Sequence, residues 1–117
     1  MKEFPIYRQT NWGFDQTHVL DEDGITIKTL FLYKKQGTSL QYHHERDEIW
    51  IPINRAKVIT GIEENEIELN EYEFIVNPRE GIHRLVGIED ASIVTEVSYG
   101  NFDEDDVKRI RDYYGRV

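Results

Sequence analysis

Apolar and polar residues alternate along short stretches through most of the chain. The clearest stretch is residues 25–33, in which Ile25, Ile27, Phe31 and Tyr33 fall on one side. Alternation with a period of two is typical of a β-strand whose two faces meet different surroundings. The same pattern, interrupted by turn residues, predicts further strands at residues 17–20, 48–53, 56–62, 66–69, 72–76, 83–86 and 91–97. So many short strands indicate an all-β domain, built as an antiparallel sandwich or barrel.

The pattern changes near the C-terminus. Val107, Ile110 and Tyr113 are spaced for one face of a helix, and Gly115 stands where a C-terminal cap belongs. Acidic residues crowd the start of this stretch and basic residues follow, as the helix dipole favours. We therefore predict a short C-terminal α-helix at residues 103–115.

The size of the chain fits one domain with a single core, residues 1–117. Residues 1–10 show no sustained period and are expected to form an N-terminal arm. There is no cysteine, which excludes disulfides and thiolate zinc sites. No apolar run approaches the ~20 residues that a membrane helix needs, so we expect no membrane association and a cytoplasmic location.

Acidic residues outnumber basic ones, 23 to 14, for a formal net charge of −9. Phosphate backbones require a basic face, so nucleic acid is not expected as a partner. An anionic small molecule remains compatible with this balance where local arginines outweigh the global charge.

Residues 41–50 contain a dense group of metal-binding side chains, with two imidazoles and three carboxylates. In an extended strand His43 and Glu45 share a face, and a bulge near residues 46–47 would return Glu48 to it. Imidazole and carboxylate together suit a divalent metal such as manganese, iron, nickel or zinc. His83, in a turn-rich segment, is the candidate for a fourth ligand.

These residues also have plain structural interpretations. His43 and His83 could be histidines at the edge of the core, although two motifs in register favour ligands. Glu45 is either a ligand or the mark of a site that has lost its metal. His44 faces away from His43 in an extended strand and is assigned to the surface.

The chain resembles a known family in collinear pieces that cover about residues 10–116. Its histidine-rich strand, followed about forty residues later by a Pro-x-x-Gly-x-His turn, resembles the two motifs of the cupins. A closer resemblance is to the isomerase domain of type II mannose-6-phosphate isomerases. It rests on Asn11-Trp12-Gly13, residues 39–50, 56–58 and 78–85, Glu96-Val97, and residues 103–109 and 114–116.

The resemblance implies a cupin-type antiparallel β-barrel, or jelly roll, with metal ligands at His43, Glu45, Glu48 and His83. A histidine is expected where Glu45 stands, so the implied site is harder and more anionic than a histidine-rich one. Larger members of the family carry an N-terminal guanylyltransferase half. Nothing in this sequence resembles a nucleotide-binding glycine-rich loop, and nucleotide transfer is not expected.

Two further positions depart from the family pattern. Arg55 stands where the family has a turn glycine, and Ile49 stands where a histidine is common. Losing the glycine changes the geometry of a turn without touching the expected site.

The function implied by the resemblance is aldose–ketose isomerisation of a sugar phosphate, such as mannose 6-phosphate to fructose 6-phosphate. A metal would polarise the sugar oxygens, and a carboxylate or lysine would move the proton between C1 and C2. Strand alternation suggests Lys57 and Glu96 for this proton transfer, although the two could instead pair across the barrel.

The phosphate of such a substrate needs cations, for which Arg46 and Arg84 are the candidates. Both could equally balance the excess of carboxylates. Gln41 shares the face of His43 and could ligate the metal or hydrogen-bond the substrate.

Two other classes of function compete with the isomerase. A non-catalytic cupin that binds sugar or assists assembly would explain the replacement at Glu45. Another metal-dependent small-molecule cupin enzyme, such as a dioxygenase, could use the same His/Glu ligands. In each case the apolar edge around Ile51 and Ile53 predicts a homodimer.

Overall fold

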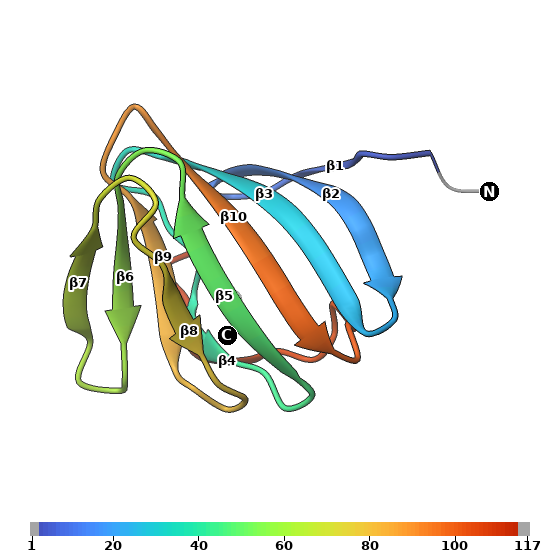
Figure 1. The fold of residues 1–117 in the computed structure, drawn as a ribbon. Helices are drawn as coiled ribbons and strands as arrows, with labels where there is room; N and C mark the ends of the chain where they lie inside the picture. Colours follow the sequence, from blue (N-terminus) through green and yellow to red (C-terminus); the bar gives the residue numbers. More distant parts are fainter. Residues whose placement is uncertain (1–2, 115–117) are drawn as a thin grey trace.

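The chain forms two antiparallel β-sheets that pack face to face, in a computed structural model that describes residues 3–114 (Figure 1). Its strands are β1 (Ile6–Gln9), β2 (Gly13–Glu22), β3 (Ile25–Tyr33), β4 (Leu40–Tyr42), β5 (Arg46–Pro52), β6 (Ala56–Thr60), β7 (Asn65–Leu69), β8 (Ile75–Asn77), β9 (His83–Gly87), β10 (Ala91–Gly100) and β11 (Lys108–Arg111). The predicted all-β class and most of the predicted strands are therefore confirmed.

One sheet has six strands in the order β1-β2-β3-β10-β5-β8, and the other has five in the order β11-β4-β9-β6-β7. Strands that are distant in sequence, such as β3 and β10, pair along most of their length. Each sheet keeps two edge strands within residues 3–114, so the expected closed barrel is replaced by an open sandwich. No helical segment in this part of the chain has the length and apolarity that a membrane crossing requires.

The hydrophobic core fills one end of the space between the sheets. Trp50 and Leu32 of the six-stranded sheet are fully buried against Val58 and Leu85 of the five-stranded sheet. Burying each such side chain stabilises the fold by about 1.5–3 kcal/mol, which makes this cluster the anchor of the sandwich. The other end of the interior is polar and contains the site described below.

The predicted C-terminal helix is wrong. Residues 108–111 form β11, which pairs with β4 through Lys108↔Tyr42 and Arg109↔Gln41. The preceding acidic residues form a turn, in which the Asp106 carboxylate accepts hydrogen bonds from the backbone amides of His44 and Glu45. A short isolated helix is marginal in water, and the open edge of β4 offers more backbone hydrogen bonds. Gly115, the expected cap, lies outside the described residues.

Two other expectations need correction. The N-terminal arm contains β1, which pairs with β2 along residues 6–9. Residues 41–50 are not one extended strand with a bulge, because β4 ends at Tyr42 and β5 begins at Arg46. The turn at residues 43–45 between them determines where the metal-binding side chains point.

Candidate metal centre and its cavity

Three side chains that can ligate a metal meet in the polar end of the interior: His43, Glu48 and His83. The Nε2 atom of His43 lies 3.4 Å from Glu48 Oε1, and the Nε2 atom of His83 lies 3.5 Å from the same oxygen. All three side chains are at most 3% exposed. The structure thus brings together three of the four predicted ligands.

Each ligand comes from a different element. His43 opens the turn after β4, Glu48 lies on the inward face of β5, and His83 is the first residue of β9. His83 is held opposite Gln41 because β9 pairs with β4 there. The site therefore depends on strand pairing between segments forty residues apart.

Hydrogen bonds on the far side of each ring fix the orientation of both imidazoles. His43 Nδ1 lies 2.7 Å from the Asp106 carbonyl oxygen, and His83 Nδ1 lies 3.0 Å from the Gly81 carbonyl oxygen. A carbonyl can only accept, so each Nδ1 carries the proton and each Nε2 directs its lone pair toward Glu48. Protein metal sites use this arrangement to aim a histidine at the ion.

Glu48 Oε1 is a buried oxygen with no hydrogen-bond partner among the described residues. It faces two imidazole nitrogens whose lone pairs point the same way, and such a group is satisfied by a cation between them. Arg46 already contacts the rim of this group, through Nε to Glu48 Oε2 at 3.4 Å and Nη2 to His43 Nε2 at 3.3 Å. The residues present fit a divalent metal held by two imidazoles and one carboxylate.

The electrostatics of the group keep Glu48 ionised. Burial disfavours its charge, but the neighbouring His43, His83 and Arg46 outweigh it and lower the pKa of Glu48 to about 2. Burial also lowers the pKa of His83 to about 4. An ionised carboxylate beside a neutral imidazole is the protonation state that metal binding requires.

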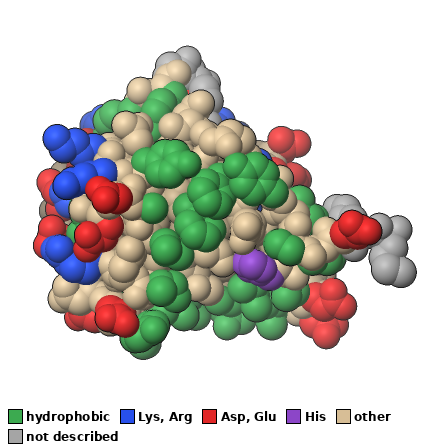
Figure 2. Space-filling view, turned by 90° about the horizontal axis from the view of Figure 1, so that it is seen from above, with side chains coloured by type: hydrophobic (Ala, Val, Ile, Leu, Met, Phe, Trp, Pro, Cys, Tyr) green, Lys and Arg blue, Asp and Glu red, His purple; other side chains and the backbone are tan. Residues whose placement is uncertain are grey.

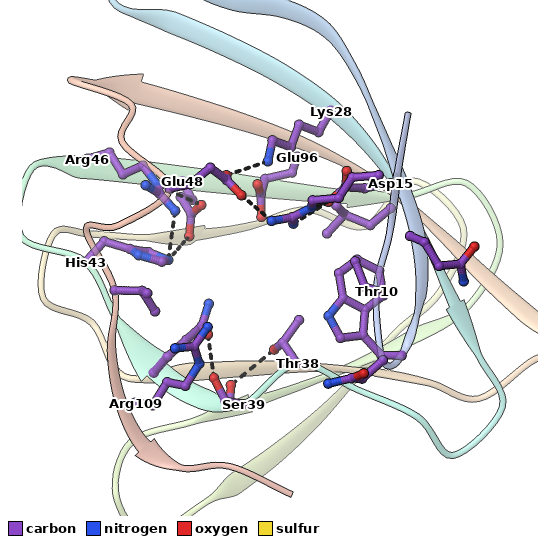
Figure 3. A pocket seen from close by; sticks show the side chains of 18 residues that line it. Thr10, Asp15, Lys28, Thr38, Ser39, His43, Arg46, Glu48, Glu96 and Arg109 are labelled. Carbon is purple, nitrogen blue, oxygen red and sulfur yellow. Dashed lines mark hydrogen bonds and ion pairs between the residues drawn. The ribbon is translucent and has the colours of Figure 1, made fainter. Parts of the chain in front are cut away.

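A cavity of about 350 Å³ opens beside the metal-binding group, and His43 and Glu48 form part of its wall. Figure 3 shows its lining: Glu96, Lys28 and Asp15 on one side, and Ser39, Thr38 and Arg109 on the other. His83 stands behind this wall, against the ring of Trp50. The cavity has room for a small polar molecule next to the metal-binding group.

Glu96 reaches the cavity from β10, where it is 9% exposed and accepts a hydrogen bond from Trp50 Nε1 at 3.1 Å. Burial, together with the negative charge of Glu48, raises the pKa of Glu96 to about 7 against the opposing pull of Lys28 and Arg46. A carboxyl group that titrates near neutral pH can both take up and release a proton. The predicted catalytic role of Glu96 is compatible with this position.

The cavity also contains cations, most of which are engaged. Lys28, opposite Glu96 on β3, donates to Glu104 Oε1 at 2.9 Å, and Arg8 contacts Asp15 and Glu104. The side chain of Arg109, by contrast, makes no hydrogen bond or ion pair within residues 3–114 and is exposed at the cavity mouth. It is the cation most available to an anionic ligand.

Other predicted site residues lie near the metal-binding group without joining it. Gln41 lines the cavity and accepts a hydrogen bond from Ser39 Oγ. The guanidinium of Arg46 also lines the cavity, but it is held by Glu48 and the Asp103 carbonyl oxygen. Arg46 therefore positions the metal-binding carboxylate in addition to facing the ligand space.

Three predicted site residues lie elsewhere. Glu45 is exposed in the turn and pairs with Asn101, because the chain changes direction after His43. Lys57 points out of the five-stranded sheet and pairs with Glu66 at 2.6 Å. Arg84 donates to the Thr38 carbonyl oxygen and lies over the ring of Tyr113. We therefore remove Glu45 from the ligands, Lys57 from the catalytic residues and Arg84 from the phosphate site.

Sequence reasoning missed Lys28 and Arg109. Lys28 is the one charged residue in the clearest predicted strand, residues 25–33. A lysine is rarely buried without a polar partner, so its position in this strand is a sequence signal for a polar site. Arg109 was assigned to a helix, and only its pairing with Gln41 brings it to the cavity.

Comparisons with known proteins agree with this architecture. The family model described as mannose-6-phosphate isomerase C-terminal matches residues 3–112. Alginate biosynthesis protein AlgA of Pseudomonas putida is 36% identical over 93 residues, which make up 78% of this chain and 19% of that protein. AlgA of Pseudomonas fluorescens is 36% identical over 80 residues, 67% of this chain and 16% of the relative. The chain thus spans about a fifth or less of the length of these relatives.

Solved structures of low sequence identity share the fold. The capsular polysaccharide assembling protein CapF from Staphylococcus aureus aligns with a TM-score of 0.73 at 14% identity, over 91% of this chain and 34% of that one. KdgF from Halomonas aligns with a TM-score of 0.70 at 15% identity, over 90% and 99% of the two chains. At such identities the likeness shows the cupin fold alone. The family model, which matches nearly the whole chain, shows the family: this chain belongs to the mannose-6-phosphate isomerase C-terminal family of cupins.

Proposed function

We propose that this domain is a metal-dependent sugar-phosphate isomerase that interconverts mannose 6-phosphate and fructose 6-phosphate. The observation that carries the proposal is the buried Glu48 oxygen that lacks a protein partner and faces two oriented imidazoles at the wall of a polar cavity. Membership of the family supports the substrate class.

His43, Glu48 and His83 would hold the metal, and His43 and Glu48 also line the cavity. When bound, a divalent metal supplies Lewis acidity that stabilises negative charge on the sugar oxygens at C1 and C2. Arg46 keeps the carboxylate of Glu48 in place from the other side. The low pKa of Glu48 means that this ligand needs no deprotonation at neutral pH.

Proton transfer is assigned to Glu96. Isomerisation requires a base to remove the proton alpha to the carbonyl and return it to the neighbouring carbon. Glu96 lines the same cavity as the metal-binding group, and its pKa of about 7 suits both steps. Trp50 holds one carboxylate oxygen by its indole N–H, so the other oxygen is left to reach the substrate.

Phosphate recognition is assigned to Arg109 in place of Arg84. Its guanidinium has no protein partner within residues 3–114 and stands at the cavity mouth, where a phosphate can remain partly hydrated. Arginine binds phosphate through two parallel N–H donors, which orients the sugar as well as attracting it.

The test is to measure bound metal and mannose 6-phosphate turnover in wild type, His83→Ala and His18→Ala. His18 is the matched control because it is exposed on β2 and bonded to Thr29, outside the cavity. We expect near-stoichiometric metal and turnover in wild type and His18→Ala, and loss of both in His83→Ala.

Two results would contradict the isomerase. Wild-type protein that binds no divalent metal after incubation with each ion would refute the metal site. Metal-loaded protein that binds mannose 6-phosphate in calorimetry without converting it would instead support a non-catalytic sugar-binding cupin.

A further inference from the structure

Within residues 3–114, three buried side-chain atoms lack a hydrogen-bond partner: Glu48 Oε1, Asp15 Oδ1 and Thr10 Oγ1. The first belongs to the metal-binding group, and the residues of the other two line the same cavity. A buried polar atom without a partner is costly, and native structures contain few of them. Asp15 and Thr10 therefore need an explanation that a metal at Glu48 does not supply.

The carboxylate of Asp15 is buried. Figure 2 shows acidic side chains at the margins of the visible surface, in contact with solvent. Asp15, in contrast, is 1% exposed, because it lies on the inward side of β2, in register with the buried Leu30 of β3. A carboxylate beside an apolar side chain destabilises the fold unless its oxygens are hydrogen-bonded.

Arg8 satisfies one of the two oxygens of Asp15. Its Nε and Nη2 atoms donate to Asp15 Oδ2 at 3.1 Å and 2.5 Å. The other oxygen, Oδ1, receives no hydrogen bond from the described residues. Because the two contacts with Arg8 fix the carboxylate, Oδ1 is held in place with its lone pairs unused. It is therefore a pre-organised acceptor for a donor that a ligand brings.

Thr10 lies in the turn between β1 and β2 and is also fixed. Its backbone amide donates to the Gly13 carbonyl oxygen at 3.0 Å. A side chain at Gly13 would collide with the Phe31 carbonyl oxygen, so the turn lies directly against β3. The Thr10 hydroxyl, which can both donate and accept, is thereby held at the wall of the cavity.

These two side chains lie far from the metal-binding group. Figure 3 shows Asp15 and Thr10 at the opposite end of the cavity from His43 and Glu48. In the six-stranded sheet β3 and β10 separate β2 from β5, which places the two ends about 14 Å apart across the strands. The group that meets Asp15 is therefore a different part of the ligand from the one at the metal.

The free atoms define the chemistry of that group. Asp15 Oδ1 only accepts, so the ligand must donate to it, and a phosphate or carboxylate would be repelled. An ammonium group would meet the cations Arg8 and Lys28 in the same wall. A neutral hydroxyl meets neither objection. It can donate to Oδ1, while a neighbouring hydroxyl exchanges a hydrogen bond with Thr10 Oγ1.

We propose that Asp15 and Thr10 form a hydroxyl-binding subsite that makes the cavity selective for polyhydroxylated ligands. The inference rests on the proposed function for the identity of the sugar. With C1 and C2 at the metal-binding group and the phosphate at Arg109, the hydroxyls at C3 and C4 are left for this subsite. A ligand without them leaves a buried carboxylate oxygen unpaired, which is how a polar site rejects a deoxy analogue.

The experiment measures binding of 1,5-anhydromannitol 6-phosphate, which keeps the hydroxyls at C3 and C4 but has no carbonyl carbon to isomerise. Calorimetry compares this parent probe with its 3-deoxy and 4-deoxy forms on metal-loaded protein. The proteins are wild type, Asp15→Asn, Thr10→Val and Asp21→Asn. Asp21 is the matched control, because it is an exposed carboxylate on the same strand and does not line the cavity.

We expect wild type and Asp21→Asn to bind at least one deoxy form about 10–100-fold more weakly than the parent, since a hydrogen bond to a charged acceptor is lost. In Asp15→Asn, Arg8 keeps the amide oxygen on its side, so an NH₂ group replaces Oδ1. This variant should bind the parent about 10–100-fold more weakly and bind the deoxy form equally. Removing a negative charge would by itself strengthen phosphate binding, so weaker binding is not an electrostatic side effect. Thr10→Val should lose about tenfold or less.

Wild type that binds none of the probes, or binds all three equally, overturns the subsite. An Asp15→Asn variant that still discriminates like wild type also overturns it. The deoxy series on wild type needs no variant and decides the matter even where Asp15→Asn does not fold. Discrimination without turnover of mannose 6-phosphate supports the subsite and refutes the isomerase, and turnover without discrimination does the reverse.

Discussion

The two faces of the six-stranded sheet reverse the usual distribution of polarity. The inner face buries charged side chains, among them Lys28, Glu48 and Glu96, each at most 9% exposed. The outer face, formed by the intervening residues of β3, β10 and β5, presents isoleucines, valines and aromatic rings, and Asp47 is its one charged residue on these strands. An isolated sheet with one solvated face normally shows the opposite pattern.

The difference indicates that the two faces serve different purposes. Buried charges rarely add net stability, even when paired, because desolvation cancels most of the Coulombic gain. Here each has a polar partner: Arg46 and Ser98 donate to Glu48, Trp50 donates to Glu96, and Lys28 donates to Glu104. The inner face is therefore best explained by chemistry.

The largest effect is expected from Glu48→Gln, which removes the negative charge of this inner-face side chain and keeps its size and shape. Metal affinity should fall more than about 100-fold, since even residues that only support ligands contribute about 10–100-fold, and turnover should disappear with the metal. Elemental mass spectrometry after dialysis measures the first quantity. Glu45→Gln is the matched control and should keep its metal, because Glu45 points into solvent. Loss of metal from both variants would show that Glu45 is a ligand after all.

Glu96→Gln should lower kcat by about 10²–10⁴-fold while metal content stays at the wild-type level, because proton transfer is lost and the ligands are intact. Turnover of mannose 6-phosphate by the metal-loaded variant checks this. A kcat near that of wild type would show that another residue acts as the base.

The same variant makes a prediction about stability in the metal-free protein. Burial raises the pKa of Glu96 from 4.5 to about 7, so its protonated form fits the folded state. This contribution is complete below pH 4.5 and is lost as the pH rises through about 7. The free energy of unfolding of wild type should therefore fall relative to that of Glu96→Gln across this window, by about 3 kcal/mol at most. Urea denaturation at several pH values measures it; parallel curves would show that Glu96 titrates normally.

Arg109→Ala should raise KM for mannose 6-phosphate about 10–100-fold with little change in kcat, since a charge-assisted contact to a remote phosphate is lost. Arg109→Lys should recover part of the loss. Arg55→Ala is the control, because Arg55 is exposed and pairs with Glu68, away from the cavity. A fall in kcat with unchanged KM would place Arg109 in the chemistry instead.

The smallest effect is expected from Lys28→Met, which makes the inner face more like an ordinary core. Its substrate affinity should fall by about tenfold or less. Its stability should stay close to that of wild type, because Glu104 is half-exposed and keeps its ion pair with Arg8, so the change leaves that carboxylate neither buried nor unpaired. Chemical denaturation checks this. Destabilisation of more than about 2 kcal/mol would mean that Lys28 and Glu104 hold the fold together.

Much of the site could be predicted from sequence. His43, Glu48 and His83 were recognisable by residue type and by the spacing of two motifs, and the structure brings them together. A continuous strand over residues 41–50 predicts Glu45 on the same face as His43, and so among the ligands. The turn after β4, stabilised by Asp106 from a segment sixty residues away, sends it outward. Local patterns carry no information about such a distant hydrogen-bond acceptor.

By itself, the sequence determined most of the strands but not β1 and β11, because a period of two is local and repeats in most of the elements. It also determined the absence of disulfides and identified three side chains that can ligate a metal. Only the tertiary structure decided which side of each strand faces inward, since on β3 both sides contain apolar residues. It also turned the C-terminal segment into β11 and brought Arg109 to the cavity, because pairing with β4 outweighs a weak helical preference. The period of a strand depends on a few neighbouring residues. The side of a strand that is buried, the strand it pairs with and the residues that line the cavity depend on the whole sandwich.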